Sequence, residues 1–522
     1  MVELCQNYIM KKILPLFLYF IVSNVAAQSL KGSLSASSTR SSIVHMNRVE
    51  KIRLEMPLSD GKNYMDLNLS QLMTALHVPG LSIAVINNYK IVFTKGYGVV
   101  AQGSSQRVKP ATLFQAASVS KPVTAMASML LVNKQVLTLD EDVNHFLTTW
   151  KVPSNSFTEQ HPVTLRELIA HRAGVNVHGF AGYNRKLPIP TLKQILDGEQ
   201  PANNPAIRVI TVPGGMESYS GGGIVIEQLL LTDVTKKPFS TVMSGLVLDK
   251  LGMTNSTFIQ PLPDKWHSKA ASGTNSNGNQ VPGHWFIYPE QGPAGLWTTA
   301  TDLAKFAIGL GRAQNGMPNA ILPKQLAKAM VTPFIDGGAQ CFHLDPLNEG
   351  LYSHNGQNEG FESLLVMNWK TGNGLVLLAN SDNGEHLWDL LLQNVSKEFG
   401  WNYQFEQKPK TFLAIAQLAG VDVMLKYFDA QKAKGISESG AGEGDLNETG
   451  YFYLGSGQVD KALSIFKHMV FLYPKSADAY DSLGEALMKA GDKAGARKNY
   501  SKSLSLNPQN DNARQKLLEL QR

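Results

Sequence analysis

The spacing of apolar residues first predicts strands near residue 80. A mostly apolar run over 81–86 begins after Gly80 and ends at Asn87-Asn88, and a second run follows over 91–95. Two short apolar runs joined by a turn are typical of an antiparallel hairpin. We therefore expect an antiparallel sheet to begin here. Before it, the spacing over 49–76 is mostly helical, which predicts a helix ahead of the first strand.

Strand patterns return near residue 350, after a long stretch with helical spacing. They cover 351–355, 361–368 and 374–380, and turns containing glycine join them. Helical spacing is found over 122–133, 163–171, 224–235, 240–251, 301–310, 321–332 and 387–399. Strands at both ends with helices between them predict an α+β domain. Its antiparallel sheet, in which the first and last strands meet, is flanked by helices and carries a helical insertion.

The carboxyl-terminal part of the chain repeats itself. Gly450 corresponds to Gly484 and Phe466 to Tyr500, and both pairs are 34 residues apart. This period resembles that of tetratricopeptide repeats, which have two helices per unit, so we expect an all-α repeat region over 445–522. Two units are fewer than the three usually needed for a continuous core. Additional helices at 411–433 and 511–520 should cap the array, or the array should dock on the preceding domain.

Composition and charge exclude several classes of protein. The chain has 522 residues, of which 43% are hydrophobic and 17% charged, and this length accommodates two or three domains. The net charge of +6 is spread thinly, without runs of Lys and Arg among aromatic residues. We therefore expect no nucleic-acid partner.

The amino terminus has the order of a secretory signal. Lys11-Lys12 precedes an apolar stretch over 13–22, and Val25-Ala26-Ala27 offers a small-residue cleavage site. We predict a signal peptide over 1–27, followed by a flexible, serine-rich leader over 28–50. An uncleaved anchor remains the alternative. After cleavage we expect no membrane span, because no second apolar run of sufficient length follows.

The number and positions of the cysteines indicate the cellular compartment of the protein. Of the two cysteines, Cys5 lies in the predicted signal peptide and Cys341 in the mature chain, which therefore forms no internal disulfide. An exported protein without disulfides suits a bacterial periplasm, so we expect a periplasmic or secreted location.

The candidate chemistry begins at Ser118 and Lys121. On a helix these residues share a face, and the apolar run after them would partly desolvate the lysine and lower its pKa. A helix that starts near Ser118 would also direct its positive end toward the hydroxyl. This arrangement predicts a Ser-Lys nucleophile pair. The same spacing recurs at Ser464 and Lys467, inside the repeats, so the spacing alone does not specify a site.

Several stretches along the chain together resemble the serine β-lactamases and penicillin-binding proteins, in particular the class C-like serine hydrolases. They are His77 to Val85, Phe114 to Lys121, Leu165 to Gly174, Pro213 to Gly223, Gly295 to Thr299 and His354 to Gly356, in family order. The resemblance implies a hydrolase domain, which we assign to 51–402, followed by a connector and capping helix over 403–444.

The resemblance also implies roles for three residues. Ser118 would be the nucleophile that is acylated, Lys121 the general base and Tyr219 a proton shuttle. The family's Y-x-N motif here reads Tyr219-Ser220-Gly221, so a side-chain amide that would bind substrate is missing at Gly221. This departure favours simple esters over β-lactam or peptide substrates.

The family's third motif, which usually reads K-T-G, has two candidates in this chain. His354-Asn355-Gly356 resembles the H-x-G variant of the hydrolase branch, which implies that His354 lines the pocket. The backbone N–H groups of Ser118 and Gln357 would then form the oxyanion hole. A literal Lys370-Thr371-Gly372 lies between two apolar runs, next to Asn373-Gly374, and is interpreted as a hairpin turn.

These observations lead to one main hypothesis and one alternative. The main hypothesis is an exported serine hydrolase that acts through an acyl-enzyme on an ester, amide or β-lactam carbonyl of a small molecule or peptide, with an esterase or D-amino-acid peptidase favoured over a potent β-lactamase. We expect no cofactor and no metal, and interpret His171 and His178 as structural. The alternative is a weak or inactive protein that binds cell-wall fragments. In either case the repeats could bind a protein partner.

Overall fold

The computed structural model describes residues 44–56, 64–405, 411–434 and 441–521. It divides into two units, Met1–Glu50 and Lys51–Arg522, and a short helix over 44–49 is the described part of the first unit. The predicted signal peptide and most of the predicted leader lie outside the described residues. Within the described ranges, no helix is long and apolar enough to cross a membrane.

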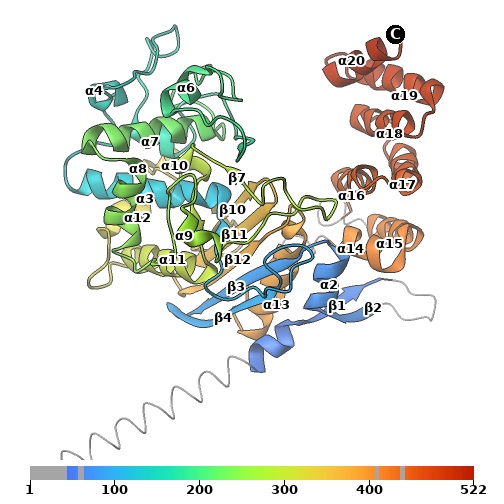
Figure 1. The fold of residues 1–522 in the computed structure, drawn as a ribbon, viewed down its shortest axis with the longest axis horizontal. Helices are drawn as coiled ribbons and strands as arrows, with labels where there is room; N and C mark the ends of the chain where they lie inside the picture. Colours follow the sequence, from blue (N-terminus) through green and yellow to red (C-terminus); the bar gives the residue numbers. More distant parts are fainter. Residues whose placement is uncertain (1–43, 57–63, 406–410, 435–440, 522) are drawn as a thin grey trace, which may run out of the picture. The chain divides into compact units, whose positions relative to one another are not determined.

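A six-stranded antiparallel sheet forms the centre of the second unit (Figure 1). Its strands, in spatial order, are β4 (Lys90–Gly98), β3 (Gly80–Asn87), β12 (Asn373–Ala379), β11 (Phe361–Asn368), β10 (Leu351–Asn358) and β9 (His343–Leu344). The register of β3 with β12 places Ala84 opposite Val376. The first and last strands of this sheet, in chain order, therefore meet, as the sequence predicted.

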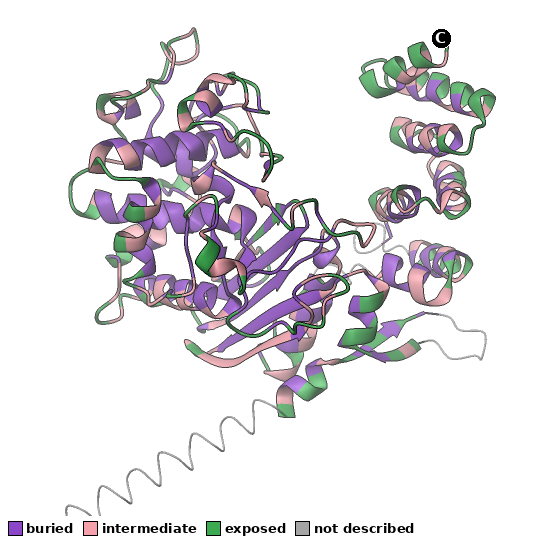
Figure 2. Ribbon diagram, viewed as in Figure 1, coloured by how far each residue is buried: buried purple, intermediate pink, exposed green. Residues whose placement is uncertain are grey.

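Helices cover the sheet and form a lobe beside it. They are α3 (Ser120–Asn133), α4 (Val143–Phe146), α5 (Leu165–Ile169), α6 (Leu192–Asp197), α7 (Gly221–Thr235), α8 (Phe239–Met243), α9 (Asp264–His267), α10 (Gln291–Ala294), α11 (Ala300–Gln314), α12 (Lys324–Ala329) and α13 (Trp388–Glu398). Helix α11 packs on the sheet against β3, β4, β11 and β12. Helix α3 is almost entirely buried in the lobe (Figure 2), and its buried polar side chains Thr124 and Ser128 form hydrogen bonds there.

Short single-turn helices and two-stranded pairs complete this domain. The turns are η1 (Ala117–Val119), η2 (Ser244–Leu248, of π type), η3 (Phe334–Asp336) and η4 (Gly384–Leu387). The pairs are β5 (Phe114–Gln115) with β8 (Trp297–Thr298), β6 (Tyr183–Asn184) with β7 (Phe286–Ile287), and β1 (Lys51–Glu55) with β2 (Tyr64–Asn68).

The prediction of a helix over 49–76 is wrong for most of the described residues in that range. The strands β1 (Lys51–Glu55) and β2 (Tyr64–Asn68) pair antiparallel, and among the described residues of this range only Val49 and α2 (Leu69–Ala75) are helical. In β1 the buried and exposed residues alternate strictly, with Ile52 and Leu54 buried. Ile52 and Leu54 are two positions apart, which is strand spacing, but the sequence analysis grouped them with Leu69, Leu72 and Leu76, whose spacing of three and four is helical.

The carboxyl-terminal region is all helical, as predicted. It contains α14 (Phe412–Ala419), α15 (Val421–Ala433), α16 (Glu443–Gly455), α17 (Val459–Leu472), α18 (Ala477–Lys489), α19 (Lys493–Leu506) and α20 (Asp511–Glu519). The helix expected at 411–433 is broken at Gly420, whose φ is +97°. The resulting pair stacks on the next, α14 on α16 and α15 on α17, and so acts as a cap. Helix α16 also contacts the preceding α+β domain, where the rings of Phe452 and His77 are 5.3 Å apart.

The repeat period follows from close packing between the two helices of each unit. A Cβ on Gly450 would lie 2.4 Å from the ring of Phe466, and a Cβ on Gly484 would lie 2.9 Å from the ring of Tyr500. Each aromatic ring therefore packs against a helix that carries no side chain at that point. The 34-residue spacing of the glycines matches that of the rings because each pair makes the same contact.

Candidate active site

Ser118 lies in a tight turn between a short strand and a buried helix. The turn follows β5 and precedes α3, which begins at Ser120, so Ser118 lies before the α-helix rather than inside it. Ala117 has φ +46°, a left-handed conformation that is strained for a residue with a Cβ. The residue before β8 holds this turn, because the Ala116 N–H donates to Leu296 O and the Leu296 N–H donates to Ser120 Oγ.

Lys121 is buried directly beside this hydroxyl. Its side chain lies in the first turn of α3, and only 3% of the residue is exposed. The Nζ atom donates to Ser118 Oγ at 2.8 Å and to Pro293 O, at the end of α10, at 3.1 Å. Burial lowers the pKa of Lys121 below its ordinary value of 10.5, while Tyr219 opposes this shift without reversing it. The predicted pair is therefore formed, and its amine is desolvated.

Tyr219 completes the group from the segment that leads into α7. The Lys121 Nζ lies 4.8 Å from the centroid of the Tyr219 ring. Two histidines, interpreted as structural from the sequence, pack against the same ring, His171 at 4.4 Å and His178 at 4.8 Å between centroids. One clue was available, because His178 belongs to an irregular stretch of the kind that forms pocket walls.

His171 is neutral in this environment. Burial is the main cause that lowers the pKa of His171 to about 3, and the nearby Lys121 adds to this effect. The Ser220 N–H donates to its Nδ1 atom, which leaves the proton on Nε2. The imidazole therefore adds packing, but no charge, around Tyr219 above about pH 4.

The edge of strand β10 lies against the turn from Ala116 to Val119, which carries Ser118 and is called the nucleophile turn below. A Cβ on Gly356 would lie 2.5 Å from Ala116 O, 2.6 Å from Ser118 N and 2.7 Å from Ser363 Oγ. These distances are far below those of real contacts, so only glycine lets the strand approach the turn so closely. Behind the strand, the Ser363 hydroxyl donates to Ala116 O at 2.7 Å, which ties β11 to the same turn.

These elements surround a pocket of about 440 Å³. It is lined by Ser118, Lys121, His178, Gly179, Phe180, Tyr219, Pro293, Ala294, His343, Asn355, Gly356, Gln357 and Asn358. The predicted residues Ser118, Lys121 and Tyr219 thus share one pocket with Asn355, Gly356 and Gln357. The sequence analysis did not identify His343, Phe180, Pro293 or Asn358.

The position expected for His354 is corrected. Side chains alternate along β10, so His354 points to the buried side while Asn355 and Gln357 are exposed. His354 is 3% exposed and does not line the pocket; its Nδ1 lies 2.6 Å from Asn355 O, and burial lowers its pKa well below 6.5. The histidine that lines the pocket is His343 of β9, whose ring centroid is 5.9 Å from that of His354.

Gly221, also expected to contact substrate, lies behind the pocket wall. A Cβ at this position would lie 3.0 Å from the Phe180 ring and 3.1 Å from His178 O. The Gly221 N–H donates to the same His178 carbonyl at 2.9 Å. The space into which a side-chain amide would extend is therefore taken by the segment His178 to Phe180, and an aromatic ring replaces the amide.

Replacing Gly221 by Asn is expected to displace Phe180 and to destabilise the protein by about 1–3 kcal/mol, as overpacking of a dense interior does. In the double variant Gly221→Asn, Phe180→Ala, the ring no longer occupies this space. We therefore expect the two destabilisations to sum to more than that of the double variant. Urea unfolding of the four proteins measures this coupling. Additive effects would show that Phe180 does not limit the space at Gly221.

Asn358 connects the strand to the nucleophile turn. Its side-chain amide donates to Gln115 Oε1 at 2.8 Å and to Ala294 O at 3.1 Å. Gln115 in turn donates to Phe286 O at 2.8 Å. This buried chain of hydrogen bonds holds β5, β10 and α10 at fixed positions around Ser118. The sequence showed only two separate amides, more than 200 positions apart.

The Lys370-Thr371-Gly372 sequence is a hairpin turn, as predicted. It joins β11 to β12, and Lys370 forms an ion pair with Glu349 rather than lining the pocket. Gly372 has φ +74°, and a Cβ there would lie 2.3 Å from the ring of Tyr89. Among the described residues, no group of three or more His, Cys, Asp or Glu side chains is arranged to hold a metal ion.

Comparisons with known proteins show which proteins this chain resembles. The chain is similar to Protein flp of Staphylococcus aureus (strain N315), with 23% identity over 328 residues, and spans 62% of its own length and 64% of that protein. It is similar to the unguisins hydrolase ungD' of Aspergillus campestris (strain IBT 28561), with 25% identity over 375 residues, which cover 65% of this chain and 67% of that one. The chain therefore spans about two thirds of these relatives.

A solved structure has the same fold. The octameric penicillin-binding protein homologue from Pyrococcus abyssi superposes with a TM-score of 0.52 at 24% identity, over 63% of this chain and 77% of that one. A tetratricopeptide repeat model matches residues 477–510, in agreement with the repeat region. The predicted fold and family are thus confirmed, and the predicted enzyme class, serine hydrolase, is that of the family. The family model described as Beta-lactamase matches residues 65–395, which are more than half of this chain. The chain therefore belongs to the β-lactamase family.

Proposed function

We propose that this protein is a serine hydrolase that cleaves uncharged esters or amides through an acyl-enzyme on Ser118. The observation that carries this proposal is the 2.8 Å contact between Lys121 Nζ and Ser118 Oγ, made by an amine that is almost fully buried. Burial lowers the pKa of Lys121, so a larger fraction of the amine is neutral and able to accept a proton.

In the acylation step, Ser118 Oγ forms a bond to the substrate carbonyl carbon while its proton passes to Lys121 Nζ. The oxygen of the tetrahedral intermediate is negatively charged, and we assign its stabilisation to the backbone N–H groups of Ser118 and Gln357. The close approach of β10 at Gly356 supports this assignment, because it brings the strand edge next to Ser118 N. The C–O or C–N bond then breaks, and the leaving group takes the proton from Lys121, with Tyr219 as the shuttle.

In the deacylation step, a water molecule attacks the ester carbonyl of acylated Ser118. Its proton passes through Tyr219 and Lys121 to Ser118 Oγ as the acyl–oxygen bond breaks, which regenerates the hydroxyl. The neutral His171 and the buried His354 pack against or near the Tyr219 ring, at 4.4 Å and 6.4 Å between centroids, and support its orientation.

The charge of the pocket supports uncharged substrates. Among the described residues that line it, Lys121 is the only Lys, Arg, Asp or Glu. A substrate carboxylate, such as that of a D-amino-acid peptide or a β-lactam, would therefore lose hydration without gaining a dedicated cationic partner. The aromatic ring of Phe180, in place of an amide at Gly221, supports the same conclusion.

A labelling experiment tests the nucleophile. A fluorescent fluorophosphonate is expected to label the purified protein and to leave Ser118→Ala unlabelled, because only an activated hydroxyl attacks phosphorus at an appreciable rate. Ser464→Ala is the matched control, since Ser464 has the same spacing to a lysine but lies in α17 of the repeats, and it should be labelled like the wild type. Equal labelling of Ser118→Ala would refute the proposed nucleophile, and no labelling of the wild type would favour the binding-protein alternative.

The pH dependence of turnover tests the base. Because Lys121 acts when neutral, kcat/KM for an acetate ester should rise with pH through the pKa of Lys121 and level off above it. Burial lowers this pKa, so the rise should lie clearly below 10.5. Between the folded-state pKa and 10.5 the unfolded chain binds the extra proton, so this group should also make folding stability increase with pH over that interval. A rise centred at 10.5, or a flat profile, would contradict the assignment.

Substrate class, location and partner complete the proposal. We expect kcat/KM to be at least 100-fold higher for a chromogenic ester than for a D-Ala-D-Ala peptide or a chromogenic cephalosporin, measured side by side.

Export rests on the amino-terminal sequence, and amino-terminal sequencing of protein from a periplasmic extract would test cleavage after Ala27. The repeats support a protein partner, because such arrays present extended concave surfaces.

A further inference from the structure

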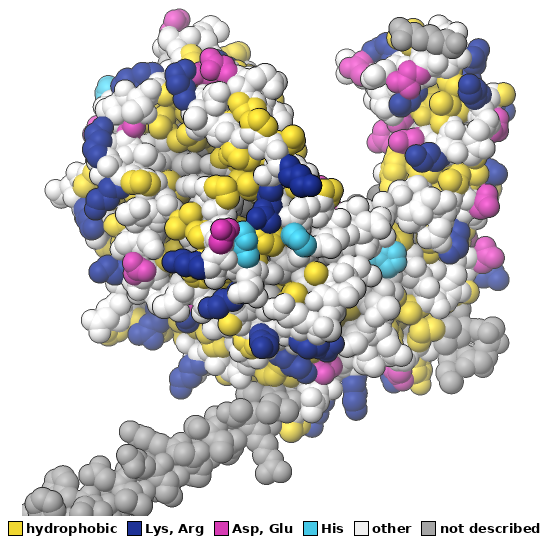
Figure 3. Space-filling view, viewed as in Figure 1, with side chains coloured by type: hydrophobic (Ala, Val, Ile, Leu, Met, Phe, Trp, Pro, Cys, Tyr) yellow, Lys and Arg dark blue, Asp and Glu magenta, His cyan; other side chains and the backbone are white. Residues whose placement is uncertain are grey.

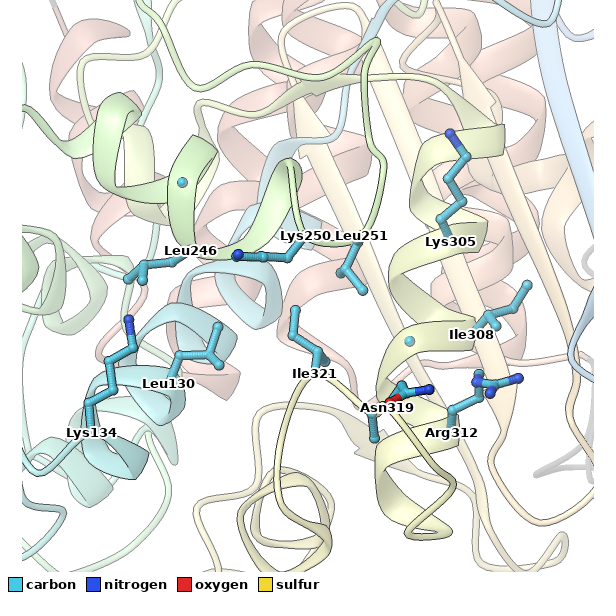
Figure 4. A pocket seen from close by; sticks show the side chains of 13 residues that line it. Leu130, Lys134, Leu246, Lys250, Leu251, Lys305, Ile308, Arg312, Asn319 and Ile321 are labelled. Carbon is cyan, nitrogen blue, oxygen red and sulfur yellow. The ribbon is translucent and has the colours of Figure 1, made fainter.

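A second cavity, larger than the active-site pocket, lies at the carboxyl end of α3 (Figure 4). Its volume is about 510 Å³, within the range of sites that enclose one small organic molecule. Helix α3, the π turn η2, helix α11 and the loop over 319–321 surround it. Its lining consists of Leu130, Lys134, Gly245, Leu246, Lys250, Leu251, Lys305, Ile308, Gly309, Arg312, Asn319, Ala320 and Ile321.

The inner surface of this cavity is apolar and only partly covered. Leu246, Leu251, Ile308 and Ile321 pack against the hydrophobic core but remain partly exposed. Leu130 lies beneath them and is 8% exposed. Partly exposed aliphatic side chains gathered in a hollow offer an alkyl chain a place to leave water.

All the charged side chains in the lining are positive. Lys305 already has an ion-pair partner, since its Nζ donates to Asp302 Oδ1 at 2.7 Å and to Gly252 O at 2.5 Å. Lys134, Lys250 and Arg312 form no ion pair with any carboxylate in the part of the chain that the structure describes. In Figure 4 the ammonium groups of Lys134 and Lys250 lie toward Leu246, while Arg312 lies at the α11 side. The cavity thus combines an apolar wall with unneutralised positive charge, and an anionic amphiphile complements both features.

We propose that this cavity binds an anionic single-chain amphiphile, a free fatty acid, with its carboxylate between Lys134 and Lys250. The alkyl chain would lie along Leu246, Leu251 and Ile321, toward Ile308. A concave cavity of this volume suits one chain, whereas a membrane surface would need a protruding apolar face. The proposal is independent of the hydrolytic function, because no residue of this cavity lines the active-site pocket.

Gly245 provides a variant that fills the cavity without disturbing the core. It lines the cavity, its φ is not in the left-handed range, and a Cβ there would meet nothing within 4 Å. A leucine at this position can therefore occupy the space that the alkyl chain would take. Retained ester hydrolysis by Gly245→Leu, with an unchanged circular dichroism spectrum, would show that this variant folds.

Isothermal titration calorimetry of the full chain with monomeric decanoate tests the proposal. We expect saturable binding that is at least tenfold weaker for 1-decanol and for decyltrimethylammonium. Binding should be lost in Gly245→Leu and at least tenfold weaker in the double variant Lys134→Gln, Lys250→Gln. The matched control, Lys489→Gln with Lys493→Gln, changes the net charge equally at exposed positions of the repeats and should bind like the wild type.

Two further outcomes would overturn the proposal. Equal binding of decanoate to Gly245→Leu and wild type would show that the ligand lies elsewhere, including the active site. Co-sedimentation with phosphatidylglycerol vesicles that depends on Lys134 and Lys250, but is unaffected by leucine at position 245, would identify a membrane-facing surface instead of a cavity. Decanoate binding that does not depend on the two lysines would exclude the carboxylate contact.

Discussion

Replacing Lys121 by methionine is expected to lower turnover of an acetate ester by about 10³-fold, the scale of general acid–base catalysis. Lys121 Nζ lies 2.8 Å from Ser118 Oγ and is the base that accepts its proton. Methionine has a side chain of similar length but no nitrogen that could accept this proton. KM should change little, because the Lys121 amine is buried and does not pair with an uncharged substrate. The measurement is steady-state hydrolysis of a chromogenic acetate ester.

Stability separates this loss from misfolding. Lys121 is 3% exposed, and desolvation of its amine opposes folding, so methionine at this position should not lower the midpoint of thermal unfolding. Lys467→Met is the matched control, because Lys467 has the same spacing from a serine but is exposed on α17, and its activity should equal that of the wild type. Substantial activity in Lys121→Met would mean that another group takes the proton from Ser118.

Replacing Gly356 by alanine is expected to reduce both stability and activity. The added Cβ would lie 2.5 Å from Ala116 O and 2.6 Å from Ser118 N, both backbone atoms that cannot rotate away. The strand must therefore move away from the nucleophile turn. Overpacking of this kind costs about 1–3 kcal/mol. A displacement of about 1 Å in the reacting groups lowers turnover about 10²-fold.

Urea unfolding and ester hydrolysis measure the two effects of Gly356→Ala. The matched control is Gly245→Ala, which adds the same methyl group where nothing lies within 4 Å, and both of its values should stay close to those of the wild type. If Gly356→Ala retained full turnover, the edge of β10 would not position the oxyanion hole, and the role proposed for the Gln357 N–H would be wrong.

Much of the local structure could be predicted from the sequence. The apolar runs at β3 and β4, the glycine turn at Gly372 and the 34-residue period of the repeats each arise from contacts between near neighbours. Their spacing therefore appears directly in the chain. The Ser118–Lys121 pair belongs to the same class, because three positions along a helical backbone bring two side chains to one face.

The residues that line the pocket were harder to predict from the sequence. His354 was expected to line the pocket, but the alternation of side chains along β10 turns it inward. His178 was interpreted as structural, yet its ring lies 4.8 Å from that of Tyr219. A strand pattern of period two indicates which residues share a face. Which of the two faces meets the pocket depends on the helices packed against the sheet.

The sequence by itself determined the order of the elements, the Ser-Lys pair and the repeat architecture, since these depend on interactions over a few residues or on a fixed period. Only the tertiary structure decided how the pair is used. The carbonyl of Pro293 that accepts from Lys121 is 172 positions away, and the strand that meets Ser118 N is more than 200 positions away. Packing of such distant segments buries the amine, lowers its pKa and leaves room only for glycine at position 356.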